Sequence, residues 1–509
     1  MFVVLQITHA WVVDDAYITL RTVDNFVNGL GLRWNPGERV QSYTHPLWMF
    51  ALSAVYFVTR EAFYSTVVLS VGVSLIAIQV AARSVRATAF QAVLLLALLL
   101  GSKAFLDYST SGLENPLTHL LLALFFVRWL GGRDERRALF LIAALGFVNR
   151  MDTLLFFAPA ILLLAYEQRA DLRSFARDFV TGFSPALAWC LFSLLYYGTI
   201  VPNTAIAKLS GSRVTAEERL QAGLAYFADS AMFDPLTLVS ITMALIVSFQ
   251  SRQRRIVAAA VGLVLYLLYV LLAGAFGTHM GFRFFSAALF LSALLLACQV
   301  HERAVAYVAC AVVAVWMVAS PVSPLRAGFD NYAQPSSDRG RGVIIDTRRF
   351  VLAEGGAFMN GVPGQSMPRH VWYRAGRDYR DNPERVHVGG LMEYLAIGYS
   401  GFASGPTHHF IDVLGLSDPL IARIPLSKTD PFRPGHPFRG MPEGYVESVT
   451  EGRNLIKDPD LAKYWDAVRT ITQEPVFSPE RLFTLVRFNL GAYEPHLDAY
   501  AERANLRPR

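Results

Sequence analysis

Long runs of apolar residues, separated by short polar connectors, occupy most of the chain between residues 62 and 325. A helix needs about 20 apolar residues to cross a bilayer, and about 17 at the least. The pattern therefore predicts membrane-spanning helices over 62–82, 87–102, 115–127, 138–149, 153–166, 179–198, 235–251, 256–282, 284–300 and 304–325.

Two of these spans, 138–149 and 153–166, are short for a crossing. The basic segments 128–137 and 169–177 flank the pair, and basic connectors gather on the cytoplasmic side of a membrane. Both segments can be cytoplasmic only if two crossings separate them. We therefore interpret both short spans as helices, in a locally thinned bilayer or buried in protein.

The same alternation predicts which loops face the outside. Segment 47–58 would break it by crossing, so an interfacial helix on the membrane surface is expected there. The residues before Asp14 are too few for a crossing, which indicates a short first helix or a start farther upstream. About eleven transmembrane helices are expected, with outer loops at 14–61, 103–116, 149–152, 199–234 and 276–283.

The last third of the chain has a different composition. Residues 324–509 are rich in Gly, Pro, Arg and Asp, and they contain no apolar run able to cross lipid. We expect residues 1–323 to form an α-helical polytopic membrane domain. Residues 324–509 are expected to form a soluble α/β or β-rich domain on the same, periplasmic, side as the outer loops.

Composition agrees with a membrane protein. Of the 509 residues, 53% are hydrophobic and only 17% are charged, whereas soluble domains have about 25% charged residues. The net charge of +6 does not indicate nucleic-acid binding, because membrane proteins collect Lys and Arg in their cytoplasmic loops. The cysteines Cys190, Cys298 and Cys310 lie in apolar segments and are interpreted as packing residues.

Several common sites are excluded by their missing motifs. The chain has no GxxxxGK[ST] and no GxGxxG after a strand, so no nucleotide-binding loop is predicted. It has no HExxH and no pair of CxxC motifs, so no metal site is assigned, although a divalent cation would be compatible with the acidic residues.

An acidic pair, Asp14 and Asp15, follows the first apolar segment. A carboxylate that is partly desolvated at a membrane edge has a raised pKa and can act as a general base. Alternatively, Asp15 caps a helix over "AYITLRTVDNFVNGLG" that ends at Gly29 or Gly31. One aspartate as a cap and one as a catalyst is compatible with both interpretations.

Four further polar clusters fall in the predicted outer loops. Ionisable groups this close to apolar spans usually face a cavity or each other, and cations there could hold a phosphate through charge-assisted hydrogen bonds. An ordinary turn, a structural Arg–Asp pair and arginine anchors at the membrane surface are the alternatives. The clusters contain Asp107 and Glu114, Arg150 and Asp152, Lys208, and His279 with Arg283.

An ordered set of motifs spans nearly the whole chain. It comprises "DDAYITLR", "NPGERVQSYTHPLW", "SGLENPL", "NRMD", "YYGTIVPNTAIAK", "HMGFRFF", "AIGYSGF", "FIDVLGLSDPLIAR" and "RPGHPFRGMPEGY". The set resembles the membrane-embedded GT-C glycosyltransferases. More narrowly, it resembles the mycobacterial terminal β-(1→2)-arabinofuranosyltransferases and their bacterial relatives, some of which are called flagellar motor control proteins. Met151 stands where such enzymes usually show a proline.

This resemblance implies inverting sugar transfer from a polyprenyl-phosphate donor, most simply of arabinofuranose, to a periplasmic glycan or glycoconjugate. It also implies a multi-pass protein of the bacterial inner membrane. Asp14 is expected to be the general base and Asp15 to orient the donor sugar or a cation. Donor and phosphate binding are expected from Arg150, Asp152, Lys208, His279, Arg283 and Glu114. Acceptor binding is expected from Tyr43, His45 and His436, with Arg433 and Tyr445 as further candidates.

Other functions remain open at this point. The enzyme could use another lipid-linked sugar, such as mannose, or a pilin or flagellin acceptor. A motor-associated membrane protein could keep the fold without activity. A transporter is disfavoured by the large extramembrane domain and by the lack of two similar halves.

Overall fold

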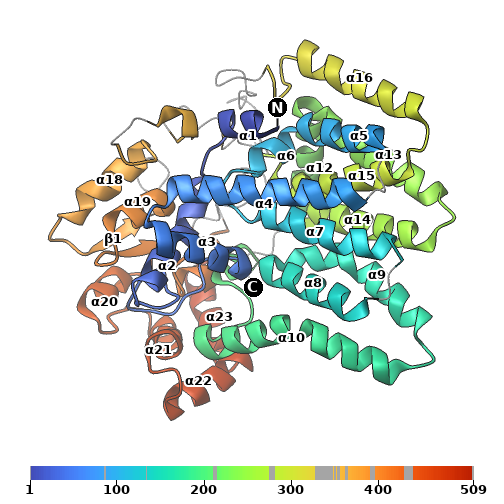
Figure 1. Ribbon diagram of the computed structural model, residues 1–509. Coiled ribbons are helices and arrows are strands. Elements are labelled where there is room, and N and C mark those ends of the chain that lie inside the picture. Colours follow the sequence, from blue (N-terminus) through green and yellow to red (C-terminus); the bar gives the residue numbers. More distant parts are fainter. Residues whose placement is uncertain are drawn as a thin grey trace.

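The computed structural model describes residues 2–84, 88–132, 135–209, 215–273, 281–326, 348, 351, 356–361, 365–389, 396–428 and 439–506. Figure 1 shows a bundle of long helices that lie side by side, with the C-terminal region and the helices α2 and α3 together at one end of it. The bundle and this end region meet where the loops between the long helices emerge.

All ten predicted apolar spans are helical. The helices are α4 (Phe63–Ser84), α5 (Ala89–Leu100), α7 (Asn115–Leu130), α8 (Arg136–Asn149), α9 (Leu154–Glu167), α10 (Leu172–Tyr197), α13 (Pro235–Gln250), α14 (Arg254–Ala273), α15 (Arg283–Gln299) and α16 (Arg303–Ala319). The apolar pattern alone therefore predicted the long helices, although α10 begins seven residues before its predicted span (172 against 179) and α16 ends six residues before the end of its span (319 against 325).

Three helices in the described part of the chain, α4, α10 and α14, are long and apolar enough to cross a membrane. A fourth candidate is a bent pair, α12 (Ala216–Phe233) followed by α13, with 108° between the two axes. The helices α5, α7, α15 and α16 are apolar but shorter, at 10–17 residues. The count of about eleven crossings stays a prediction.

The helix α12 lies where the pattern predicts an outer loop, over residues 199–234. Its start is polar: Thr215 and Glu218 form a reciprocal N-terminal cap, in which each side chain bonds the other's backbone amide. Its buried face combines Tyr226 with the small residues Ala222, Gly223 and Ser230. Gly223 lies so close to α14 that a Cβ there would stand 1.9 Å from the backbone oxygen of Leu271. This close approach depends on the neighbouring helix and leaves little hydrophobic signal in the sequence.

The helix α15 forms the centre of the bundle and is buried along nearly its whole length. Its neighbours are α5, α7, α13 and α14, while α8 packs along α10 and α4 along α7. Aromatic side chains fill the contacts between the helices, for example Phe156 stacked on Tyr266 with ring centroids 4.2 Å apart.

Short elements form the end of the bundle that faces the C-terminal region. The predicted helix after the acidic pair is confirmed as α2 (Asp14–Val27), with Gly29 and Gly31 following it at positive φ. Segment 47–58 lies within α3 (Pro46–Thr59), which confirms the helix but not its place at a membrane surface. The remaining short helices are α1 (Phe2–Thr8), α6 (Lys103–Tyr108), η1 (Met151–Thr153) and α11 (Asn203–Leu209).

The C-terminal region is mixed α/β and mainly helical over the residues that the structure describes. Its only described sheet pairs β1 (Val386–Gly389) with β2 (His409–Asp412) in parallel, with Val386 opposite His409. The helices are η3 (Phe358–Asn360), α18 (Val371–Arg380), α19 (Ile397–Ser404), η4 (Ile421–Arg423), α20 (Tyr445–Glu451), α21 (Pro459–Gln473), α22 (Pro479–Asn489) and α23 (Glu494–Arg503).

Buried arginines join this region to the rest of the chain. Arg21 on α2 donates hydrogen bonds to the carbonyls of Gly401 and His408, and its guanidinium lies 4.2 Å from the ring of Trp34. Arg39 likewise donates to the carbonyl of Ile471. Since buried carbonyls need donors, these contacts hold the first loop and the C-terminal region in one arrangement.

Candidate active site

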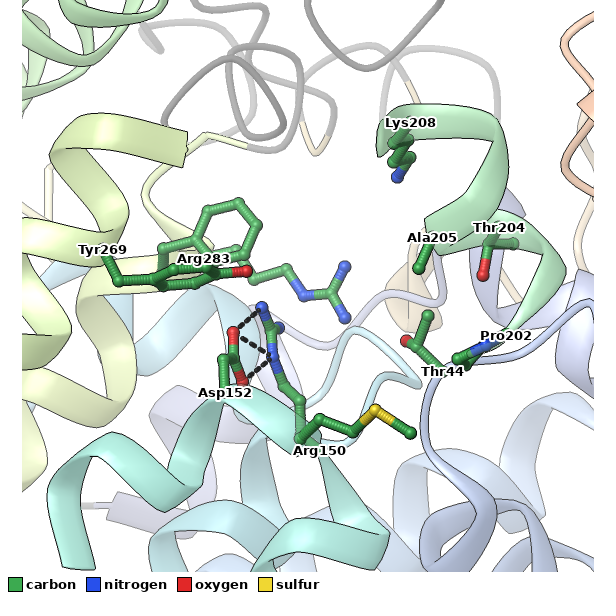
Figure 2. Close-up of a pocket in the computed structure, with 11 residues that line it drawn as sticks. Thr44, Arg150, Asp152, Pro202, Thr204, Ala205, Lys208, Tyr269 and Arg283 are labelled. Carbon is green, nitrogen blue, oxygen red and sulfur yellow. Dashed lines mark hydrogen bonds and ion pairs between the residues drawn. The ribbon is translucent and has the colours of Figure 1, made fainter. Parts of the chain in front are cut away.

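A cavity of about 170 Å³ lies where the bundle meets the short elements (Figure 2). Four of the residues predicted for donor binding line it, and they come from parts of the chain far apart in sequence. The lining consists of Thr44, Arg150, Met151, Asp152, Pro202, Thr204, Ala205, Lys208, Tyr269, Arg283 and Phe284.

The cavity residues sit at the ends of helices. Arg150 follows the last residue of α8, where the backbone becomes extended at φ −166° before η1 begins. Arg283 is the first residue of α15, and Lys208 lies in the last turn of α11. Figure 2 shows Lys208 and Arg283 pointing from different helices toward the same space. The ends of the bundle helices α8 and α15 and the short helix α11 therefore converge to bring these cations together.

Glu114, which is fully buried beneath the cavity, holds the two lining arginines in place. Its carboxylate accepts hydrogen bonds from Arg283 Nη2 at 2.7 Å and from Arg150 Nη1 at 2.8 Å. It also lies 3.1 Å from Nδ1 of His45. Burial alone would raise the pKa of Glu114, but Arg283, His45 and Arg150 hold that pKa well below its usual range. Glu114 is therefore an ionised anchor beneath the cavity and does not line it.

The cavity carries excess positive charge. Arg150 pairs with Asp152 through Nε and Nη2, at 2.7 and 2.6 Å. Among the described residues that line the cavity, two guanidinium groups and the Lys208 ammonium are cationic, and Asp152 supplies the one carboxylate. The Nε of Arg283 is buried and has no hydrogen-bond partner among the residues that the structure describes. Unused donors and a positive balance suit an anionic oxygen ligand.

The C-terminal region places Lys208. The side chain of Asn203, at the start of α11, donates to the carbonyl oxygens of Gly415 and Asp418 at 2.8 and 3.1 Å. At the other end of the helix, Arg439 donates to the carbonyl of Ala207. The motif "FIDVLGLSDPLIAR" therefore supplies the turn on which this cavity-lining helix rests.

Asp14 does not face the cavity. Its carboxylate accepts hydrogen bonds from the backbone amides of Tyr399 and Gly398, at 2.7 and 3.2 Å, and so caps the start of α19. A Cβ on Gly398 would lie 1.9 Å from the backbone oxygen of Asp14, so only glycine permits this approach. Asp14 thus joins α2 to α19.

Asp15 has different surroundings, and it is not among the residues that line the cavity. It is half-buried in the first turn of α2. Burial lowers the pKa of Lys208. The negative charge of Asp15 acts in the opposite direction, and its effect on this pKa is larger than that of Glu114. No hydrogen bond to the Asp15 carboxylate occurs within the described ranges. Of the acidic pair, Asp15 is the member that interacts electrostatically with the cavity residue Lys208.

Asp14 gives the protein a pH-dependent stability. Burial raises its pKa from 3.8 to about 7; Asp15 and Asp412 add to this effect, and the two backbone amides oppose it. Because the folded state holds the proton more tightly, this contribution is complete below about pH 4 and is lost as the pH rises through about 7. We expect Asp14→Asn to reduce the fall in unfolding midpoint between about pH 5 and about pH 8. Thermal unfolding in detergent would measure this, with exposed Asp381→Asn as the control that leaves the fall unchanged.

The residues predicted for acceptor binding lie elsewhere. Tyr43 is 1% exposed, and its hydroxyl bonds that of Tyr197 at 2.8 Å. His45 is 4% exposed and is held between Glu114 and Thr19. Burial removes both side chains from any direct contact with an acceptor in this conformation; their neighbour Thr44 lines the cavity instead.

The other predicted site residues fall into two groups, one within the described residues and one outside them. Tyr445 is buried and donates to the carboxylate of Asp418 at 2.9 Å, which is a structural contact. His279, Arg433 and His436 lie outside the described residues. Among the residues whose placement is described, no three His, Cys, Asp or Glu side chains gather closely enough to hold a metal ion.

The chain is similar to terminal β-(1→2)-arabinofuranosyltransferases. It is 30% identical to that enzyme of Mycobacterium tuberculosis over 224 residues, which make up 39% of this chain and 35% of the relative. It is 28% identical to that of Corynebacterium glutamicum over 239 residues, 41% of this chain and 34% of the relative. The match thus spans about a third of the length of each curated relative.

No family model matches the chain. ArnT from Cupriavidus metallidurans, solved bound to undecaprenyl phosphate, has a TM-score of 0.45 and 12% identity, over 80% of this chain and 84% of ArnT.

Sequence reasoning missed part of the cavity wall. Tyr269 lies within the uniformly apolar span of α14, and Phe284 follows Arg283 in an apolar run. Aromatic residues at such positions are usually packing residues, so the apolar pattern does not distinguish aromatic residues that line a cavity from those that fill the core. Thr204 and Pro202 belong to the motif "YYGTIVPNTAIAK". Their closeness to Lys208 in the sequence could have indicated that they line the same cavity.

Proposed function

We propose that this protein is an inverting GT-C glycosyltransferase that moves arabinofuranose from a polyprenyl-phosphate donor to a periplasmic glycan or glycoconjugate. The observation that carries the proposal is the cavity in which Arg150, Lys208 and Arg283 converge at the end of an apolar bundle. A lipid-linked phosphate needs both features, cations for its head and an apolar surface for its chain. The named activity of the relatives supports the choice of sugar.

In this proposal the cations bind the donor phosphate. The guanidinium of Arg283 and the ammonium of Lys208, which both line the cavity, supply donors, while Glu114 and Asp152 hold the two guanidinium groups in fixed orientations. Fixed cations stabilise the charge that grows on the phosphate as the leaving group departs. His279, which lies beside this site in sequence, stays a further candidate for it.

Asp15 serves as the general base, a role that we now assign to it instead of to Asp14. It takes the proton of the acceptor hydroxyl as that oxygen bonds the anomeric carbon of the sugar. The bond from that carbon to the phosphate oxygen breaks, and polyprenyl phosphate leaves with the electron pair. Attack opposite the leaving group inverts the anomeric configuration. Asp14 is already bonded at both oxygens.

The proposed setting is the inner membrane of a bacterium, with the cavity and the C-terminal region on the periplasmic side. The concentration of basic residues in the opposite connectors supports this orientation. The acceptor would approach from the C-terminal region, where His436 and Arg433 are candidates for its recognition.

The direct test is a transfer assay with the purified full-length protein in lipid nanodiscs. Polyprenyl-phosphate arabinofuranose, labelled in the sugar, is offered with an arabinan oligosaccharide, and parallel reactions use polyprenyl-phosphate mannose. Transfer from the arabinose donor alone supports the proposal. Transfer from the mannose donor alone would show that the enzyme uses a different sugar from the one proposed. Binding of neither donor in a filter assay would favour a non-catalytic protein.

Replacing Lys208 with glutamine is expected to weaken donor binding. A hydrogen bond to a charged group contributes about 1.5–3 kcal/mol, so the donor KM should rise about ten- to a hundredfold. Initial rates at varied donor concentration measure this. Lys463→Gln, at an exposed position on α21, is the matched control. An unchanged KM in the Lys208 variant would remove this residue from the donor site.

A further inference from the structure

The helix α22 has two distinct faces. Arg481, Thr484 and Leu485 are buried against the rest of the protein. The opposite side carries apolar residues at a spacing of three and four, which puts them in one stripe on a helix. Together with Phe477, two residues before the helix begins, they form what we call the α22 stripe: Phe477, Phe483, Val486 and Leu490, which are 74%, 64%, 58% and 80% exposed.

Hydrogen bonds fix α22 to the end of a candidate membrane-spanning helix. Arg481 Nη2 donates to the carbonyl oxygens of Leu195 and Tyr196 in the last turn of α10, at 2.8 and 3.1 Å. Asn489 donates to the carbonyl of Gly198, just past that helix, at 3.0 Å. Figure 1 shows α22 at the end of α10 that faces the C-terminal region. The stripe therefore lies at the level where α10 leaves the apolar layer.

Apolar exposure continues along this part of the molecule. Leu187 and Leu191, in the second half of α10, are also more than half exposed, as suits residues that face lipid. Ile200 follows the helix and is exposed too. Large apolar side chains gathered on a surface mark an interaction site, and here they adjoin the end of a helix apolar enough to span a membrane.

We propose that the α22 stripe inserts into the headgroup region of the bilayer and holds the C-terminal region against the membrane surface. The ligand is a lipid surface. Arg487 fits this setting, because its guanidinium lies 5.5 Å from the rings of Phe483 and Tyr493 and can reach lipid phosphates while the rings enter the apolar layer. A helix with one apolar face and flanking cations is typical of such interfacial contacts.

Site-specific photo-crosslinking tests this surface. The photoreactive amino acid p-benzoylphenylalanine is placed at Phe483 in the full-length protein, which is irradiated in membranes and analysed by mass spectrometry and gel electrophoresis. Leu187 on α10 is the positive control for lipid contact. Glu447, an exposed residue of α20, is the negative control, because α20 lies on the side of the C-terminal region away from the bundle (Figure 1).

We expect lipid adducts at Phe483 in a yield that approaches that at Leu187 and exceeds that at Glu447 several-fold. A crosslinked dimer would show that a second copy covers the stripe, and an adduct with another protein would show a protein partner; either result overturns the proposal. Lipid adducts at Leu187 without any at Phe483 would place the stripe in water. Absence of lipid adducts at both Phe483 and Leu187 would contradict the premise that α10 faces lipid. That result would also overturn the proposal.

Discussion

Replacing Asp15 with asparagine is expected to lower the rate of sugar transfer by about 10²–10⁴-fold, the usual effect of losing a general base. Asparagine has nearly the same shape but cannot accept the proton of the acceptor hydroxyl. Asp15 is half-buried and its carboxylate makes no hydrogen bond within the described ranges, so the fold should tolerate the change. The measurement is the single-turnover rate with labelled polyprenyl-phosphate arabinofuranose.

The matched control is Asp14→Asn, one residue away in the same helix turn. Its side-chain oxygen can still accept one of the backbone amides at the start of α19, so transfer should continue at a rate close to that of the parent protein. The opposite result, with Asp14→Asn inactive and Asp15→Asn active in folded proteins, would return the base to Asp14. Donor binding should be unchanged in both variants, which separates this failure from loss of the phosphate site.

Replacing Glu114 with glutamine is expected to destabilise the protein by about 3–5 kcal/mol, because it leaves buried cations without their shared counter-charge. Arg150 keeps its pair with Asp152, whereas the only acidic partner of Arg283 among the described residues is Glu114. The readout is the thermal unfolding midpoint in detergent. Glu167→Gln, at an exposed position near the end of α9, should leave this midpoint unchanged.

A double variant tests the physical cause. Adding Arg283→Met to Glu114→Gln removes the uncompensated charge and should recover part of the lost stability, although donor binding stays impaired. Destabilisation that is equal in the single and double variants would mean that the loss comes from packing around Glu114 and not from charge.

The apolar runs predicted the long helices well because a helix that faces lipid or a helical core must be apolar over its whole length. The helix α12 shows the limit of this signal. Its polar first turn and its small inner residues, such as Gly223, make sense only against the backbone of α14. A close helix contact of this kind is a property of two segments, and neither segment alone reveals it.

The acidic pair shows a second limit. Adjacent residues on a helix point in directions about 100° apart, so Asp14 and Asp15 necessarily face different surroundings. Their order in the chain does not say which one meets the C-terminal region. The amides of Gly398 and Tyr399, nearly four hundred residues away, decide that Asp14 is a structural contact.

The sequence by itself therefore determined the apolar bundle, the polar character of its loop ends, and the identities of the charged residues available there. Only the tertiary structure decided that Arg150, Lys208 and Arg283 share one cavity, that Glu114 lies beneath them, and that α11 rests on the C-terminal region. The reason is physical. Hydrophobic patterning is local and repeats along each helix, whereas the partner of a charged side chain depends on which distant residues the fold brings close to it.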